Sequence, residues 1–274
     1  MTRIATALAA VPLLLVGLGA CGDSGTAGSD PGPRVEAAAL TGLSEGEQVD
    51  TDEYVEIVLA GLEESTTARL SMETSFGEGM SLSADGVVDY TATPPSTEMT
   101  MTMPEGVPGG GEMHLISVDG VMYLSMGEMT GGGYWKLDPS DPDGPLGDMG
   151  LDAMLDQSDP RAALETVEPA IEAVTFVGAE QVDGRDLDHY ELTVDPQRAL
   201  EVLGGDLPAE AAGAVPETIT YDLWLDEDHR FARMAMEYPV LEQTISTQLD
   251  VTDWGEEVSI VAPSADQVED LPSF

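Results

Sequence analysis

Apolar and polar residues alternate in segment after segment of this chain, and a period of two residues is the pattern of half-buried β-strands. The clearest run is Met99, Met101 and Met103 with threonines between them. Comparable alternation predicts strands at 70–76, 80–90, 112–118, 121–126, 174–182, 185–194, 219–225, 232–238 and 245–251. We therefore expect about ten or eleven strands, without the strand–helix–strand order of a parallel sheet.

Aspartate–glycine pairs mark where several of these strands turn. Asp119-Gly120 predicts a type I′ hairpin, and Asp183-Gly184 predicts a second hairpin. Asp85-Gly86 resembles a turn as well, but the alternation stays in phase across it. We expect one long strand there with a glycine bend, a device of curved sheets.

Three or four helices are expected, and three of them are predicted from capping signals and from apolar residues three or four positions apart. Thr51 caps a helix to about residue 65, whose apolar stripe contains Tyr54, Val55, Val58, Leu59 and Leu62. Asp159-Pro160 and Asp195-Pro196 each begin another. The helix from Asp159 is expected to carry Leu164, Val167 and Ile171 and to kink at Pro169.

The stretch from Gly127 to Gly150 is rich in Gly, Pro and Asp, and only the apolar segment 134–137 interrupts it. This composition favours a mobile flap, followed by weakly helical sequence at 151–155. The flap is our candidate for a gate.

The first twenty residues have the pattern of a secretory signal peptide, with Arg3 followed by an apolar run that is too short to span a membrane. The run ends at Leu18-Gly19-Ala20-Cys21, which resembles the bacterial lipobox. Cys21 would then be diacylated and become the mature N-terminus, whereas an ordinary signal peptide would leave it merely nearby. We predict a signal peptide at 1–20, a flexible tether at 21–49 and one domain at 50–274.

Charge and motifs exclude several function classes. The net charge of −44 would repel nucleic acid, while a hydrophobic fraction of 42% is too high for a disordered acidic tail. One cysteine excludes an internal disulfide framework. The three histidines, His114, His189 and His229, lack metal spacing, and no nucleophile motif occurs, so neither an enzyme nor a cofactor is predicted.

One acidic loop is a candidate for calcium binding. Asp138, Asp141, Asp143 and Gly144 are close in sequence, but an EF-hand register would put Pro139 first and Gly150 twelfth. Neither residue supplies a carboxylate, so the loop does not fit the EF-hand motif. Weak calcium binding stays open beside the simpler interpretation of a solvated acidic loop.

Methionine is unusually common, with 14 Met against 4 Phe. Because Met is unbranched and polarizable, it adapts to variable apolar shapes. Two interpretations stay open: ordinary core packing, or a deformable pocket for acyl chains. For the pocket we predict a lining of Met72, Met80, Leu82, Met99, Met101, Met103, Leu223, Met234 and Met236.

Four segments in this order and spacing, together with the lipobox, resemble the actinobacterial lipoproteins of the LppX and LprG type, whose fold is similar to that of the LolA and LolB carriers. The segments are Ser83–Val88, Ile116–Leu124 followed by Tyr134–Leu137, Tyr221–Met236 and Asp253–Val268. Unlike a typical member, this chain is extremely acidic and has Lys136 as its only lysine.

The resemblance implies an α+β fold, a curved antiparallel half-barrel wrapped over a few helices. It also implies a hydrophobic cavity for the acyl chains of an envelope lipid or lipoglycan. Such a protein would be a lipid-anchored monomer on the extracytoplasmic face of the cell membrane, with an envelope transporter as a candidate partner. The alternatives are a structural or envelope-sensing lipoprotein with a closed core, and a secreted hydrolase, for which no residue can be nominated.

Overall fold

The structure is a computed structural model of the chain. It describes residues 40, 42–63, 65–76, 80–92, 94–104, 111–137, 164–165, 167–202, 216–240 and 243–270. These residues belong to two compact units. Unit 1 contains the described parts of 24–64 and 161–248, and unit 2 those of 65–160 and 249–274.

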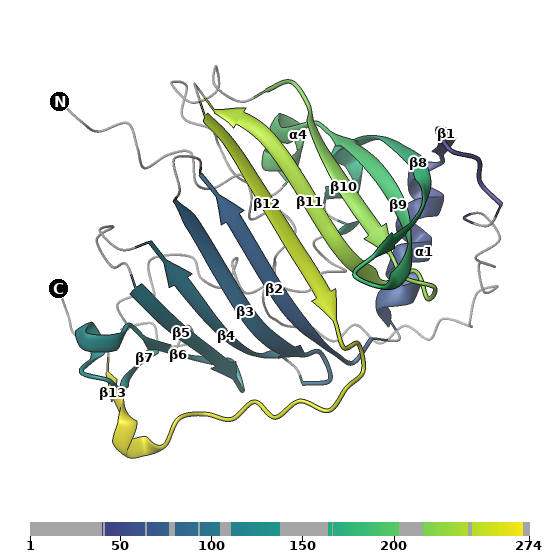
Figure 1. Cartoon of the computed structure of the whole chain (residues 1–274). Helices are drawn as coiled ribbons and strands as arrows, with labels where there is room; N and C mark the ends of the chain where they lie inside the picture. The colour runs from purple at the N-terminus through teal and green to yellow at the C-terminus, as the bar shows by residue number, and fades with distance from the viewer. Residues whose placement is uncertain are drawn as a thin grey trace. The chain divides into compact units, whose positions relative to one another are not determined.

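Unit 2 is a sheet whose hydrogen-bonded order is β2-β3-β4-β5-β6-β7-β13 (Figure 1). Neighbours from β2 to β7 are antiparallel, and β13 is parallel to β7. Two short 3-10 helices, η3 and η5, accompany the sheet. The elements are β2 Thr67–Ser75, β3 Ser81–Asp89, β4 Ser96–Met103, β5 Gly111–Val118, β6 Val121–Ser125, η3 Gly127–Thr130, β7 Tyr134–Leu137, η5 Ala265–Gln267 and β13 Val268–Asp270.

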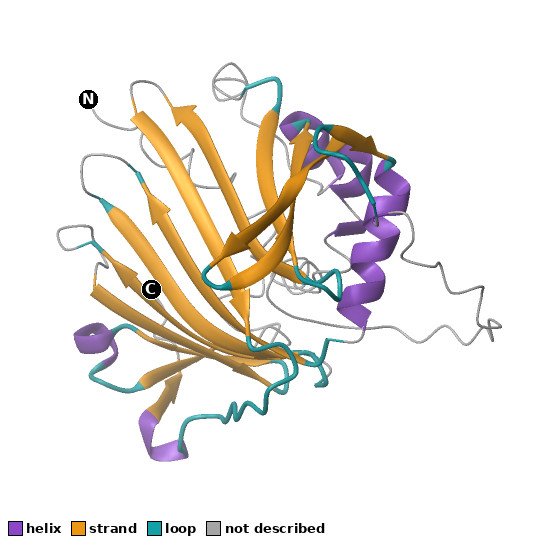
Figure 2. Cartoon of the chain, turned by 45° about the vertical axis from the view of Figure 1, so that its right-hand side comes forward, coloured by secondary structure: helices purple, strands orange, loops and turns teal. Residues whose placement is uncertain are grey.

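Unit 1 has the strand order β1-β8-β9-β10-β11-β12, and its last strand continues into unit 2 at Leu249. Helix α1 lies along this sheet (Figure 2) and contacts β8. The elements are β1 Glu47–Val49, α1 Thr51–Glu63, η4 Glu168–Ala170, β8 Ile171–Val182, β9 Arg185–Val194, α4 Pro196–Val202, β10 Ile219–Leu225, β11 Phe231–Val240 and β12 Gln243–Thr252.

The predicted fold class is confirmed: the described residues form an open, predominantly antiparallel sheet with few helices. The thirteen described strands exceed the predicted ten or eleven because β1 and β13 add three residues each at the two ends of the strand order. Strand β1 lies within the segment predicted as a tether, where it pairs with Val174–Phe176 of β8.

The two predicted hairpin turns are confirmed by their backbone angles. Asp119 and Gly120 have φ values of 53° and 75°, and Asp183 and Gly184 have 52° and 80°. Positive φ at both central residues is the geometry of a type I′ turn. Each turn therefore fixes the register of the strands that it joins, with Val118 opposite Val121 and Val182 opposite Arg185.

Asp85-Gly86 lies inside β3, so the prediction of one continuous strand is confirmed. A Cβ atom at Gly86 would lie 2.5 Å from the carbonyl oxygen of Glu98 and 3.2 Å from Cβ of Met99. Glycine therefore lets β4 approach β3 closely at this point, which explains why an apparent turn residue is found in mid-strand.

The predicted helices were correct in part. Helix α1 ends at Glu63, and its cap is Asp50 rather than Thr51, because Oδ1 of Asp50 accepts from the backbone N–H of Glu53 at 3.2 Å. For α4 the cap is confirmed: Oδ1 of Asp195 accepts from the backbone N–H groups of Gln197 and Arg198 at 2.9 and 3.1 Å.

The prediction of a helix from Asp159 was wrong at its C-terminal end. Ile171 is the first residue of β8, and Pro169 lies in η4 rather than at a kink. Proline breaks the α-helical hydrogen-bond pattern, so the apolar spacing of Leu164, Val167 and Ile171 did not extend one helix. The predicted start at Asp159-Pro160 lies outside the described residues.

The predicted flap was wrong for residues 127–137. They form η3 and β7, and β7 is hydrogen-bonded between β6 and β13. A Cβ at Gly133 would lie 2.6 Å from the carbonyl oxygen of Gln267, so this glycine allows the η5–β13 segment to come close. The rest of the flap, 138–150, and the weakly helical 151–155 lie outside the described residues.

The core of unit 1 lies between α1 and the sheet. Tyr54, Val55, Val58 and Leu62 of the predicted stripe are at most 5% exposed, whereas Leu59 is half-buried. A Cβ at Gly61 would lie 2.8 Å from the carbonyl oxygens of both Asp228 and His229. The last turn of α1 therefore packs directly on the β10–β11 turn, which a larger residue would prevent.

Candidate functional site

One face of the unit 2 sheet is apolar and rich in methionine. Directly opposed residues of an antiparallel ladder point to the same face, so pairing identifies its members. One row crosses six strands through Leu70, Gly86, Met99, Leu115, Leu124 and Trp135. The next row contains Met72, Ala84, Met101 and Met113. We call this surface the methionine face.

Burial varies across the methionine face. Leu70 and Met99 are 7% and 6% exposed. The other large side chains of the two rows are only half-buried: Met72, Met101, Met113, Leu115, Leu124 and Trp135. The described part of unit 2 has no α-helix to cover these side chains. The face thus combines contiguous apolar side chains with partial accessibility, which marks a surface able to take an apolar partner.

The local sequence explains why this face is continuous. From Met99 to Met103 in β4, methionines alternate with threonines, so the three methionines point one way and Thr100 and Thr102 the other. The Asp119-Gly120 turn then places Leu115 opposite Leu124. Because Met is flexible and polarizable, a face built from it can adapt to chains of different shape.

The nine predicted pocket residues fall into three groups. Met72, Leu82, Met99, Met101 and Met103 lie on strands of unit 2 with the parity of the methionine face. Leu223, Met234 and Met236 lie in unit 1. Met80 lies between β2 and β3, where its carbonyl accepts from the N–H of Phe76 at 2.9 Å, and is 42% exposed.

The unit 1 group occupies a closed core. Leu223 pairs with Met234, Tyr221 pairs with Met236, and these side chains are 1–5% exposed. Leu223 also pairs with Tyr190, whose ring contacts Tyr54 of α1 at a centroid distance of 5.2 Å. The same alternation in sequence therefore yields two environments, one closed by a helix and one partly open.

Several residues of the methionine face and of the unit 1 core were not predicted from the sequence. Leu115, Leu124 and Trp135 of the methionine face were not selected, although the two-residue turn already fixed the Leu115–Leu124 pair. In unit 1 the same holds for Phe176 and Tyr190, whose rings are 5.3 Å apart. Tyr190 lies in the polar run Asp188–Glu191, which gave no signal of burial.

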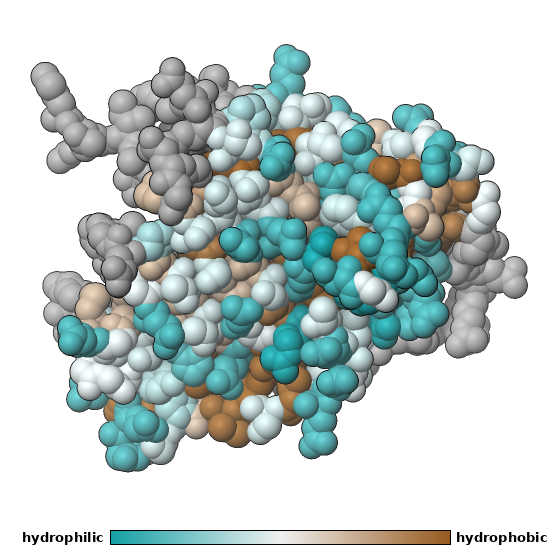
Figure 3. Space-filling view, viewed as in Figure 1, coloured by the Kyte–Doolittle hydropathy of each residue, from teal (hydrophilic) through white to brown (hydrophobic). Residues whose placement is uncertain are grey.

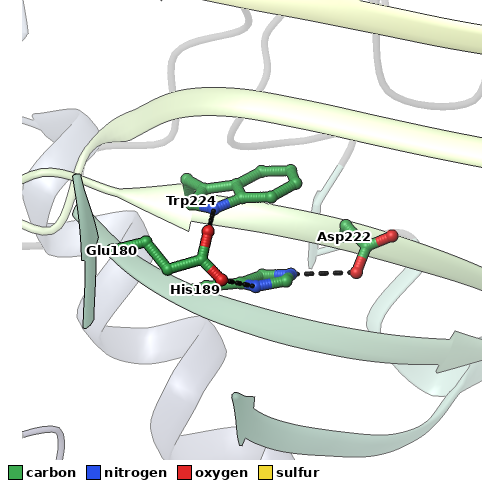
Figure 4. A network of polar contacts seen from close by, with 4 residues as sticks. All are labelled: Glu180, His189, Asp222 and Trp224. Carbon is green, nitrogen blue, oxygen red and sulfur yellow. Dashed lines mark hydrogen bonds and ion pairs between the residues drawn. The ribbon is translucent and has the colours of Figure 1, made fainter. Parts of the chain in front are cut away.

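A polar cluster connects three strands on another part of unit 1 (Figure 4). Nδ1 of His189 lies 3.0 Å from Oε1 of Glu180, and Nε2 lies 2.9 Å from Oδ1 of Asp222. Trp224 stacks on the imidazole at a centroid distance of 4.2 Å and donates from Nε1 to Oε2 of Glu180 at 3.2 Å. Both ring nitrogens are engaged, so His189 joins β8, β9 and β10 and has no free nitrogen for base catalysis.

This cluster predicts a component of acid sensitivity. Hydrogen bonds from His189, and then from Trp224, hold the pKa of Glu180 below its usual value of 4.5. A lowered folded-state pKa gives stability that is present above the unfolded value and is lost as pH falls through the folded value. Glu180→Gln should therefore cost at most about 1 kcal/mol at pH 7 and less at pH 3, since Glu180 is partly exposed.

Urea unfolding of both proteins between pH 3 and 7 measures this difference. Glu191→Gln on the neighbouring strand β9 is the matched control, because Glu191 is also exposed but is not a member of the cluster, so the same charge removal should give no comparable difference. An equal loss for Glu180→Gln at both pH values would contradict the assignment.

A second histidine lies in unit 2. Nδ1 of His114 is 2.7 Å from the hydroxyl of Tyr134, and Nε2 is 3.2 Å from Oε1 of Glu98. Partial burial, and then the charge of Glu98, raise the pKa of Tyr134. Across the described ranges, no group of three His, Cys, Asp or Glu residues could hold a metal ion. Cys21 and the acidic loop Asp138–Gly144 lie outside them.

The surface is consistent with the acidic composition. The face shown in Figure 3 is largely hydrophilic, with apolar patches between polar side chains. In the described structure, five large apolar residues are exposed by more than a third: Met80, Met129, Val177, Val202 and Val261. No helix in the described part of the chain has the length and apolarity to span a bilayer.

Comparison with known proteins supports the fold. No protein-family model matches the chain, and no curated protein matches it significantly. Among solved structures, LprF from Mycobacterium bovis aligns with a TM-score of 0.52 and 13% identity over 78% of this chain and 97% of that chain. The Mycobacterium tuberculosis lipoprotein LppX aligns with a TM-score of 0.51 and 12% identity over 77% and 98%. The resemblance found in the sequence is thus confirmed at the level of the fold.

Proposed function

We propose that this chain is an extracytoplasmic lipoprotein, anchored through acylated Cys21, that binds the acyl chains of an envelope lipid and carries or presents that lipid. The observation that carries the proposal is the methionine face, whose half-buried side chains are aligned in register across β2 to β7. The shared fold with LprF and the lipoprotein LppX supports it.

The energetics favour an apolar ligand. Covering apolar surface contributes about 25 cal/mol per Å², so an acyl chain laid along the half-buried side chains gains affinity without a charged contact. The partner must not be polyanionic, because the net charge of −44 would repel it. Covalent anchoring makes electrostatic attraction to the membrane unnecessary, since two or three acyl chains hold the protein there.

We assign this function without a catalytic step. Both ring nitrogens of His114 and of His189 are engaged by neighbouring side chains. Release of the lipid would then depend on an acceptor membrane or an envelope transporter rather than on bond cleavage. We expect a monomer, with the lipid as its cargo.

Native mass spectrometry tests the proposal. Residues 22–274, the mature chain without its acylated cysteine, would be expressed in a lipid-replete actinobacterial host and purified without detergent. We expect a mass increment that matches an acylated lipid and is lost after delipidation. Only apo mass from that host would favour the alternative, a structural or sensing lipoprotein that has a closed core and no cargo.

A further inference from the structure

The core of unit 1 contains tyrosine hydroxyls that have no hydrogen-bond partner. Among the described residues, the buried oxygens of Tyr54, Tyr190 and Tyr238 are unpaired. Tyr54 and Tyr190 are completely buried, and Tyr238 is 5% exposed. Buried hydroxyls are nearly always hydrogen-bonded, so three orphans in one core require an explanation.

Two of these tyrosines come from opposite sides of the core. Tyr54 lies on α1 and Tyr190 on β9, and their rings meet at a centroid distance of 5.2 Å with a tilt of 55°. Tyr190 also contacts Phe176 of β8. The helix and the sheet thus each bring one unpaired donor to the same aromatic contact.

Apolar, adaptable side chains lie beside this contact, and the charge of Asp188 lies close enough to Tyr190 to help raise its pKa. Leu223 pairs directly with Tyr190, and Met234 pairs with Leu223 in the next strand. Burial, and then Tyr190, raise the pKa of Tyr54, and burial raises that of Tyr190. Both hydroxyls therefore stay protonated at physiological pH and can act as neutral donors.

We propose that Tyr54 and Tyr190 form a binding site for the ester carbonyl oxygen of an acylated lipid, within unit 1. This inference rests on the proposed lipid-binding function and goes beyond it, because it places recognition of the ester group in unit 1 rather than on the methionine face of unit 2. A carbonyl suits the site because it accepts hydrogen bonds and carries no charge, whereas an anionic group would be strongly penalised by burial beside neutral donors.

Binding at this site requires movement of α1. Both side chains are closed to solvent, so the carbonyl reaches them only when the Tyr54–Tyr190 ring contact opens. The unpaired hydroxyls make the closed state less stable than an all-apolar contact would be, which lowers the barrier to this opening. The ligand then provides the hydrogen bonds that the empty core lacks.

The test compares two lipids that differ only in the carbonyl. Dipalmitoylglycerol has two ester carbonyls, and dihexadecylglycerol has ether linkages in their place. Residues 22–274, which include every described residue, should bind the ester lipid about fivefold more tightly, the effect of roughly one neutral hydrogen bond. In the Tyr54→Phe/Tyr190→Phe double variant this preference should disappear while binding of the ether lipid is retained.

A second readout is the thermal stability of the delipidated protein. Removing buried unpaired hydroxyls should raise Tm, by about 2–4 °C for each kcal/mol regained. Tyr221→Phe is the matched control, because Tyr221 lies on the same sheet at 4% exposure and its oxygen is not among the unpaired buried atoms. This control should keep the ester preference.

The outcomes separate this inference from the proposed function. Equal affinity of the unmodified protein for both lipids would overturn the carbonyl site and leave lipid binding intact. A lower Tm in the double variant would also overturn it, since the hydroxyls would then be satisfied in the empty protein, for example by water. Binding of neither lipid would overturn both the site and the proposed function.

Discussion

Replacing Met101 with glutamate should reduce lipid binding at least tenfold, because the new carboxylate would lie in the middle of the methionine face. Met101 pairs with Ala84 on one side and with Met113 on the other. An acyl chain on this row would have to bury the charge, which costs several kcal/mol, and every 1.4 kcal/mol is about a factor of ten in affinity. The bound fraction can be measured by titration with dipalmitoylglycerol.

Thr102→Glu is the matched control for Met101→Glu. Thr102 follows directly in β4, is exposed and points to the opposite face of the sheet. It pairs with Glu112, so a like-charge penalty of up to about 1 kcal/mol in stability is expected, but no loss of lipid binding. Equal loss of binding in both variants would show that charge, rather than position on the methionine face, determines the result.

Shortening Met236 to alanine should destabilise the protein by about 2–5 kcal/mol, while the same change at Met101 should cost about 1 kcal/mol or less. Met236 is 1% exposed in the closed core of unit 1, so truncation leaves a cavity there. Met101 is half-buried, so solvent and neighbouring side chains can fill the space. Urea unfolding of the two variants, both delipidated, measures the difference.

This pair of substitutions separates structural methionines from those available to a ligand. Met101→Ala should alter lipid affinity with little change in stability, whereas Met236→Ala should lower stability first. If both substitutions cost the same 2–5 kcal/mol, the methionine face would be a closed core in the delipidated protein. The proposed binding surface would then be absent.

Local sequence signals were sufficient for much of the fold. The type I′ turn at Asp119-Gly120 requires positive φ at two adjacent residues, which few residue pairs other than Asp-Gly or Asn-Gly allow. The start of α4 could be predicted from Asp195-Pro196, because the capping aspartate and the proline both act within the first turn of the helix. Strands β10 to β12 followed from uninterrupted alternation.

Elements that depend on distant partners were not predictable in the same way. Strands β1 and β13 have three residues each, and pairing with β8 and β7 defines them rather than any pattern of their own. Ile171 fits a helical spacing equally well, and only its pairing with Val194 makes it a strand residue. Tertiary context overrides propensity in such short segments.

The candidate site likewise combines features that follow from local sequence with features that depend on distant partners. Parity in β4 placed Met99, Met101 and Met103 on one face, but their pairing with β5 depends on a connection longer than a tight turn, which does not set register. Parity also could not distinguish Met101 from Met236, because their different burial depends on tertiary packing rather than on the local pattern. The unpaired hydroxyls of Tyr54 and Tyr190 have no sequence signal at all.

The most direct test of the account is photo-crosslinking with a palmitate that carries a diazirine near the end of its chain. The adducts would be mapped by mass spectrometry on residues 22–274. We predict labelling of side chains on the methionine face, above all Met101 and Met113, with competition by unlabelled lipid. Labelling confined to the opposite face, at positions such as Thr102 and Glu112, or no competable labelling, would contradict the claim that this face binds acyl chains.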